Sequence, residues 1–80
     1  RPMSIKIEKN KFYILEAGND KWIYSSEKDA INSLKEKLSE NKDLNQDNVN
    51  ILEVDTKEEK WQIKQMSWSK IAVELIRGEL

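Results

Sequence analysis

FYILEAGNDKWIY, residues 12–24, contains two predicted strands and the clearest turn of the chain. Phe12–Ala17 is rich in aromatic and aliphatic residues, as strands commonly are. Gly18-Asn19-Asp20 predicts a turn, because Gly and Asn tolerate backbone conformations that other residues avoid. Lys21–Tyr24 then predicts a second, short strand. The stretch therefore indicates antiparallel strands joined by a short turn, and a sheet onto which the remaining chain folds.

Three further strands are predicted around this stretch. Ser4–Glu8 alternates isoleucine with charged or polar residues, which indicates a strand with one buried face. Because residues 9–11 form a turn, we expect it to make a hairpin with Phe12–Ala17. Val49–Asp55 and Lys60–Met66 are the last two predicted strands, and a charged turn separates them.

Two helices are predicted from apolar residues at helical spacing. The serine pair at 25–26 offers N-caps for a helix over residues 26–40. Ser67 or Ser69 caps a last helix, and Gly78 ends it. The element order is therefore βββαββα. Short connections between antiparallel neighbours predict an α+β fold, with an antiparallel five-stranded sheet and two helices.

The chain is short enough for one domain. It has 80 residues, of which Arg1 and Pro2 precede Met3 and are interpreted as a cloning remnant. Residues 3–80 then form a single α+β domain. No apolar run approaches the roughly 18 residues of a membrane-spanning helix. The absence of Cys and of a signal-peptide pattern leads us to expect a soluble cytoplasmic protein.

Charge is distributed unevenly along the chain. Charged residues make up 36% of it, and the net charge is −1, which does not suit a strongly basic nucleic-acid binder. Residues 1–24 carry five basic and three acidic groups, residues 25–59 carry five and ten, and residues 60–80 carry four and two. All six aromatic residues lie in the two mildly basic end segments.

Most catalytic and metal-binding chemistry is excluded by composition. His is absent, which removes the commonest general base and metal ligand, and the lack of Cys removes thiol catalysis and structural zinc sites. Asp43, Asn45 and Asp47 begin like a calcium-binding loop, but Asn48 stands where that loop requires Gly. We therefore expect no catalytic centre, no metal, no cofactor, no small-molecule substrate and no membrane association.

Two of the predicted strands are apolar on both faces. They are residues 12–15, Phe-Tyr-Ile-Leu, and residues 51–54, Ile-Leu-Glu-Val. A sheet with one solvated face would alternate apolar and polar residues. Either these are central strands, or the two helices cover opposite faces of the sheet, or the second face is an interaction surface.

The last helix raises the same question, because it is apolar around most of its circumference. Val73 and Ile76 widen its apolar stripe, so the helix is either buried or binds a protein partner or a second copy. Aromatic anchors carry much of the energy of protein interfaces. The candidate partner-binding residues are Trp61, Trp68, Ile71, Val73, Leu75 and Ile76.

An alternative hypothesis is single-stranded nucleic-acid binding. Such proteins combine lysines with aromatic side chains on which bases stack. The residues that could do this on one sheet face are Lys11, Tyr13, Lys21, Trp22, Tyr24 and Lys64. Against it, the aromatic side chains are equally suited to anchoring the core. We also expect Trp61 and Ile63 to lie on an inward face of their strand.

The segment WQIKQMSWSKIA, residues 61–72, together with YSSE at 24–27, resembles small lineage-restricted archaeal proteins of the Sulfolobus type. Such proteins include accessory subunits of replication and transcription machines. The resemblance contains no specific motif and transfers no site residues. With the composition, it leads us to expect a non-enzymatic interaction module, an accessory subunit or regulator that docks on a protein partner.

Overall fold

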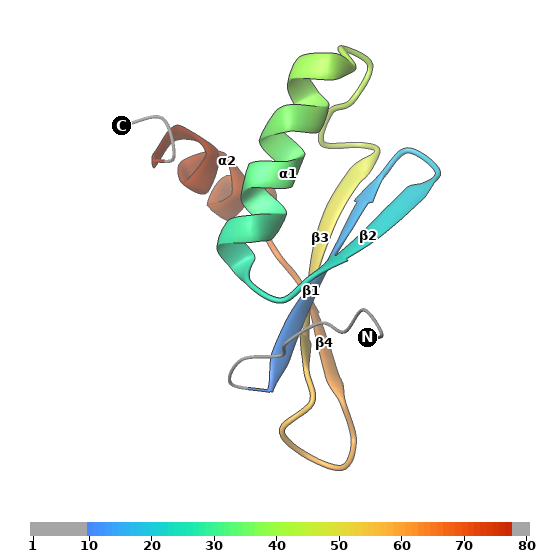
Figure 1. The fold of residues 1–80 in the computed structure, drawn as a ribbon, viewed down its shortest axis with the longest axis vertical. Coiled ribbons are helices and arrows are strands. Elements are labelled where there is room, and N and C mark those ends of the chain that lie inside the picture. The colour runs from blue at the N-terminus through green and yellow to red at the C-terminus, as the bar shows by residue number, and fades with distance from the viewer. Residues whose placement is uncertain (1–9, 78–80) are drawn as a thin grey trace, which may run out of the picture.

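A computed structural model describes residues 10–77, which form an antiparallel sheet and two helices. The strand order within the sheet is β2-β1-β3-β4. The α+β class is confirmed. In chain order the elements are β1 (Lys11–Ala17), β2 (Asp20–Tyr24), α1 (Glu27–Glu40), β3 (Val49–Asp55), β4 (Gln62–Gln65) and α2 (Trp68–Arg77) (Figure 1).

β1 and β2 form the hairpin that their sequence predicts. Ala17 and Asp20 are paired at its end, and Gly18 has a left-handed φ of 63°, which Gly adopts without steric cost. The Gly18 backbone N–H also donates to the Asn48 carbonyl oxygen at 2.9 Å. The turn therefore closes the hairpin and extends the pairing of β1 with β3.

The sheet has four strands rather than the five predicted, and the described order is ββαββα. The predicted strand Ser4–Glu8 lies outside the described residues. The predicted hairpin of that strand with β1 also falls outside the described residues. From Tyr13 to Ala17, β1 pairs with β2 on one side and with β3 on the other.

Both helices pack on the same face of the sheet (Figure 1). α1 connects β2 to β3, and both of these strands run antiparallel to β1, so the connection passes over β1. One hydrophobic core joins this face to the helices. Its buried members are Leu15, Ala17, Ala30, Ile31, Leu34, Val49, Ile51, Met66 and Ile71.

α1 begins and ends as the sequence indicates. The Ser26 side-chain oxygen accepts a hydrogen bond from the Asp29 backbone N–H at 3.1 Å, so Ser26 is the N-cap. Glu27 and Asp29 place negative charge in the first turn, where the helix dipole favours it. Ala30, Ile31 and Leu34 then enter the core.

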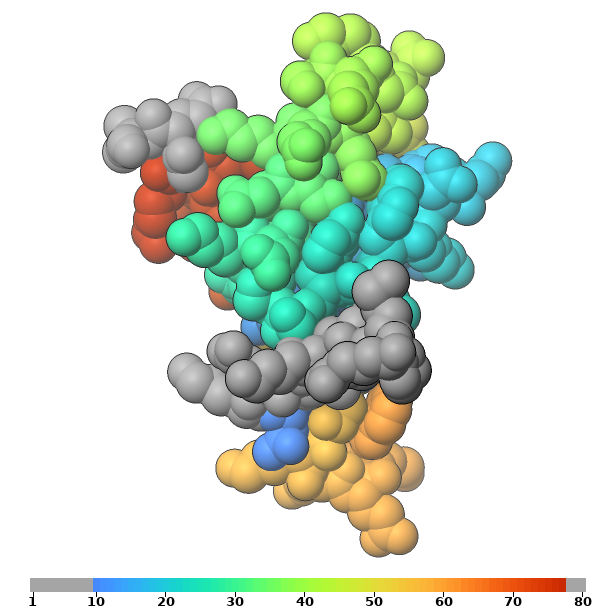
Figure 2. Space-filling model, viewed as in Figure 1, coloured from blue at the N-terminus to red at the C-terminus, as the bar shows by residue number. Residues whose placement is uncertain are grey.

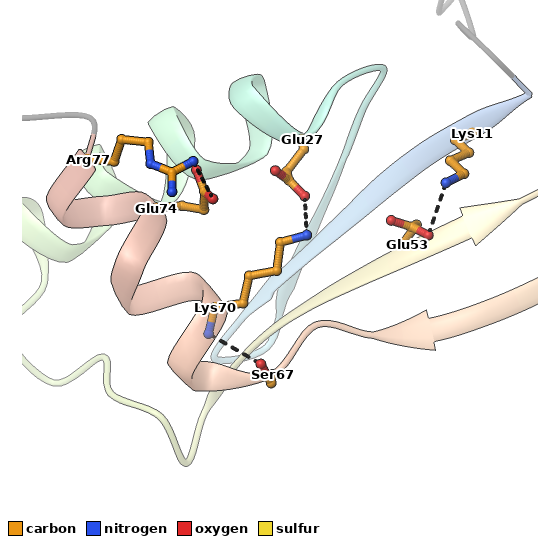
Figure 3. Close-up of polar contacts among 7 residues, drawn as sticks. All are labelled: Lys11, Glu27, Glu53, Ser67, Lys70, Glu74 and Arg77. Carbon is orange, nitrogen blue, oxygen red and sulfur yellow. Dashed lines mark hydrogen bonds and ion pairs between the residues drawn. The ribbon is translucent and has the colours of Figure 1, made fainter.

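α2 starts at the cap predicted for it. The Ser67 hydroxyl accepts from the Lys70 backbone N–H at 3.2 Å. The Lys70 ammonium group reaches a Glu27 carboxylate oxygen at 3.0 Å, an ion pair that joins the start of α2 to the start of α1 (Figure 3). The predicted helix end at Gly78 lies outside the described residues.

β4 is shorter than predicted and faces the opposite way. Ile63 is paired with Val54 on the sheet face that lacks helices, and it is 65% exposed. Trp61, which precedes β4, is 58% exposed. The expected inward face for these two residues is therefore wrong, because Met66 occupies the inward position and is 7% exposed. The turn between β3 and β4 projects beyond the helices (Figure 2).

The packing of α2 yields a first prediction. Replacing Ile71 with Val removes one methylene group from a fully packed site, so the free energy of unfolding should fall by about 0.5–1.5 kcal/mol in urea titrations. Ile76→Val is the matched control, because Ile76 is 64% exposed, and its effect should stay within about 0.5 kcal/mol. Equal effects for the two variants would contradict this packing of α2.

Candidate protein-interaction surface

The sheet face opposite α1 and α2 is called the open face here, because no helix of residues 10–77 covers it. Side chains of a strand alternate between faces, and paired residues share a face. The register of the four strands therefore assigns six apolar side chains to the open face, and Trp61 extends them next to β4. The six are Phe12, Ile14, Ile23, Leu52, Val54 and Ile63.

The apolar side chains form a continuous centre across all four strands. Ile23, Ile14 and Leu52 lie in one row of paired residues, and Phe12, Val54 and Ile63 lie in the next. Val54 is 1% exposed between its neighbours, whereas Ile23 and Ile63 are more than half exposed.

Trp61 is held at the margin of this centre by an aromatic contact. Its ring meets the ring of Phe12 edge-on, with centroids 5.9 Å apart and an angle of 80° between the planes. Edge-to-face packing suits the charge distribution of the two rings. The contact leaves Trp61 more than half exposed, as an aromatic side chain available to a partner.

A row of polar side chains borders the apolar centre. One residue from each strand takes part, and each bonds the next. The Lys21 ammonium group lies 3.5 Å from a Glu16 carboxylate oxygen, and the Asn50 amide donates to Glu16 at 3.4 Å. The Gln65 amide donates to the Asn50 side-chain oxygen at 2.7 Å. An apolar centre with a polar rim is the usual anatomy of a protein–protein interface.

The six predicted partner-binding residues fall in three different environments. Ile71 is buried in the core, and Trp68 and Leu75 pack partly buried against it. Val73 and Ile76 are exposed on α2, at 50% and 64%. Trp61 is exposed on the open face, on the other side of the sheet from the helices. The structure therefore does not bring these six residues together into one surface.

The aromatic residues of the nucleic-acid hypothesis lie on the helix side of the sheet. Tyr13, Trp22 and Tyr24 pack partly buried against the core. The Lys37 ammonium group lies 4.0 Å from the Trp22 ring centroid, and the Tyr24 hydroxyl hydrogen-bonds the Ser33 hydroxyl. These contacts occupy Trp22 and Tyr24 within the fold.

The three lysines of the same hypothesis lie on both faces of the sheet, Lys11 and Lys64 on the helix side and Lys21 on the open face. Lys21 belongs to the polar rim of the open face. Lys11 lies on the helix side, where its ammonium group is 3.5 Å from a Glu53 carboxylate oxygen (Figure 3). Lys64 is paired in register with Glu53, so acidic and basic groups alternate there. The six residues therefore form no single aromatic and basic surface.

Two groups on the helix side of the sheet, Tyr13 on β1 and Lys70 on α2, have pKa values shifted from their ordinary values. Partial burial raises the pKa of Tyr13 above its ordinary value of 10.0, and the carboxylates of Glu53 and Glu27 raise it further. A hydrogen bond to Glu27 raises the pKa of Lys70 above 10.5, with the charge of Glu27 as the next cause. Both groups are therefore held protonated by the fold.

The sequence contained a signal for the open face that the choice of candidate residues did not use. Ile14 and Leu52 lie in the two strands whose sequences are apolar on both faces. That pattern indicated a second apolar face, but whether helices cover it depends on their path. The sequence gives less indication that Ile23 and Ile63 belong to an apolar face. Each is the one apolar residue on that side of its short strand.

Comparison with known proteins finds no matching family model, curated protein or solved structure. In the described part of the chain, no group of three or more acidic side chains is placed to hold a metal ion. In the loop that resembles a calcium site, the Asn45 side-chain oxygen accepts from the Asp47 backbone N–H at 2.8 Å. None of the helices within residues 10–77 is long and apolar enough to cross a membrane.

The perturbed groups yield a second prediction. Tyr13 loses its proton at a higher pH in the folded chain than in the unfolded chain, and so does Lys70. The unfolded chain therefore binds fewer protons in the alkaline range, and stability must fall as pH rises through about 10 and above.

Urea titrations between about pH 8 and pH 11 measure this dependence. The wild-type free energy of unfolding should be higher at the lower end of that range. Tyr13→Phe should show a shallower decline, because it lacks the ionising hydroxyl, and Lys70→Gln should do the same. A stability that increases with pH over this range would be incompatible with the contacts around Tyr13 and Lys70.

Proposed function

We propose that the chain is a non-enzymatic interaction module, an accessory subunit or regulator that docks on a protein partner through its open face. One observation carries the proposal. The centre of the open face is apolar, with Ile23 and Ile63 at its two sides more than half exposed, and the hydrogen-bonded row from Lys21 to Gln65 borders it. Contiguous exposed apolar side chains of this kind mark interaction sites in small proteins.

The chemistry of the open face limits the partner that would fit. The two charged residues that the described strands place there, Lys21 and Glu16, are paired with each other in the rim. The centre therefore suits an apolar surface with few charges, such as the apolar stripe of an amphipathic helix. Polar groups of the partner would meet the amides of Asn50 and Gln65.

The proposal gives Trp61 a defined role. Trp61 lies at one margin of the open face, directly before β4, and Ile23 lies at the opposite margin, on β2. Large aromatic side chains that become buried on binding contribute disproportionately to affinity. Trp61 would act as the anchor, and the contact with Phe12 would hold its ring in place.

Single-stranded nucleic-acid binding has less support. Stacking needs exposed rings beside unpaired cations. Tyr13, Trp22 and Tyr24 instead pack against the core, and Lys11 and Lys21 have carboxylate partners. A salt-sensitive complex with a single-stranded oligonucleotide, weakened when Lys11, Lys21 and Lys64 are replaced together, would favour this alternative.

Site-specific photocrosslinking tests the proposed docking surface. A photoreactive phenylalanine analogue at Trp61 should give a discrete adduct with a protein in extracts of the source cells. Ile23→Glu in the same chain should abolish that adduct, because it places a charge in the apolar centre. Ile23 is 52% exposed, so the fold should tolerate the change.

Lys28→Glu on α1 is the matched control, because it also alters charge at an exposed position but lies on the other side of the sheet. It should leave the adduct intact. An adduct that survives Ile23→Glu, or one that Lys28→Glu removes equally, would contradict docking through the open face.

A further inference from the structure

An open cavity of about 240 Å³ lies at the end of the molecule where α1 stops. It is lined by Asp20 and Trp22 of β2, by Lys37 and Glu40 of α1, and by Leu44 of the loop that follows α1. The last turn of α1 and the turn between β1 and β2 lie at this same end (Figure 1). Three segments that are distant in the chain therefore meet around the cavity.

Two carboxylates line this cavity without a cation to neutralise them. Asp20 and Glu40 are both exposed. Within residues 10–77, the ion pairs of the fold join other residues, and neither of these carboxylates has a hydrogen-bond or ion-pair partner. Two negative charges on one small cavity therefore remain unpaired in that part of the chain.

Lys37 also lines the cavity, but its charge is engaged elsewhere. Its ammonium group donates to the Ser33 hydroxyl at 3.0 Å and lies 4.0 Å from the centroid of the Trp22 ring. Ser33 is buried, so the ammonium group is directed toward the core rather than toward Asp20 or Glu40. The contact shows that the Trp22 ring accepts a cation, and it leaves the two carboxylates free.

The end of α1 adds negative potential to the same cavity. The last turn of a helix carries a partial negative charge, because its carbonyl oxygens have no partners within the helix. Glu40 is the last residue of α1, and a carboxylate at that end is unfavourable on its own. A cation bound there would be attracted by the helix end and by both carboxylates.

A larger groove between α1 and α2 does not share this charge pattern. It measures about 430 Å³ and is lined by the carboxylates of Glu27 and Glu74. Glu27 is paired with Lys70 at 3.0 Å, and Glu74 is paired with Arg77 at 3.4 Å (Figure 3). Its acidic groups are therefore neutralised within the fold, unlike those at the end of α1.

We infer that the cavity at the end of α1 binds the side chain of an arginine from a protein partner. The guanidinium group is planar and presents its N–H donors as a fork, which suits carboxylate oxygens. It donates to Asp20 and Glu40, while its flat surface packs against the aromatic and apolar groups of Trp22 and Leu44. A lysine ammonium group is more strongly hydrated and lacks the flat surface.

The size and the lining of the cavity favour one side chain over other cations. Its volume is below the roughly 300–1,000 Å³ typical of sites for drug-sized ligands. Calcium takes about six to eight oxygen ligands, whereas two carboxylates line this cavity. In residues 10–77, no group of three or more acidic side chains is placed to hold a metal ion. A single organic cation therefore fits the cavity better than a metal ion or a larger ligand.

The inference does not depend on the proposed function of the open face. Trp22 lies on the helix side of the sheet, and the cavity is at the end of α1. A failure of the photocrosslinking experiment at Trp61 would leave the cavity's ability to bind arginine untouched. A cavity that binds no arginine would likewise leave docking through the open face standing.

Titration of the full chain with a blocked peptide, one arginine between glycines, tests the cavity by NMR. The Trp22 indole N–H signal should shift saturably, and the Trp61 indole signal, on the open face, should not move. A peptide with citrulline instead of arginine keeps the shape without the charge. It should bind at least about ten-fold more weakly, a difference of about 1.4 kcal/mol. No saturable shift at Trp22, or equal affinity for the two peptides, would overturn the inference.

A pair of double variants separates the cavity from the overall charge of the chain. Asp20→Asn with Glu40→Gln removes both carboxylates at exposed positions, so the chain should fold and bind the arginine peptide at least about ten-fold more weakly. Glu58→Gln with Glu59→Gln is the matched control. It changes the net charge equally, in the exposed turn between β3 and β4 at the opposite end of the molecule (Figure 1).

The control should bind the arginine peptide like the wild type at about 0.15 M salt, because charges more than about 8 Å apart are then largely screened. Equal weakening in the two double variants would reduce the effect to net charge and refute a specific site. Unchanged affinity after loss of the Asp20 and Glu40 carboxylates would refute it as well.

Discussion

The pairing of β1 with β3 is the constraint on which the other elements depend. It is the longest strand pair, running from Lys11 opposite Asp55 to Ala17 opposite Val49. Leu15 and Ile51 lie opposite one another near its middle, and both are fully buried. β2 attaches to the free side of β1 and β4 to the free side of β3. The remaining apolar side chains are placed relative to this pair, and the helices cover one side of it.

A helix layer on one side of the sheet has direct consequences for the surface. α1 must cross β1 to connect β2 with β3, and α2 packs beside it, held by the Lys70–Glu27 ion pair and by Ile71. The same strands that bury Leu15 and Ile51 against the helices turn Ile14 and Leu52 to the open face. The open face and the core therefore share a backbone, and a shift of one residue in register would exchange them.

The candidate surface was only partly predictable from the sequence. The two strands that are apolar on both faces are the central strands of the sheet, and the helices lie on one face rather than on opposite faces. Ile14 and Leu52 lie on the other face. Trp61 was chosen as a candidate anchor and expected on an inward face, whereas its side chain is 58% exposed on the open face. The residues proposed on the last helix divided between core and solvent. Helical spacing shows that α2 has an apolar stripe, but it does not show how much of that stripe is buried. Because α1 covers only one side of α2, Val73 and Ile76 remain exposed.

Local chemistry in the sequence determined the element types and several of their boundaries. The turn at Gly18, the cap at Ser26 and the cap at Ser67 each rest on contacts within a few residues, which a sequence pattern can specify. The strand Val49–Asp55 was predicted from its apolar composition, although its partner β1 is distant in the chain. Tertiary structure alone decided the neighbours of β1, the face of Trp61 and Ile63, and the placement of both helices on one side. All three depend on residues that are distant in the chain. The alternation of apolar and polar residues shows that the two faces of a strand differ, but it does not show which face the helices cover.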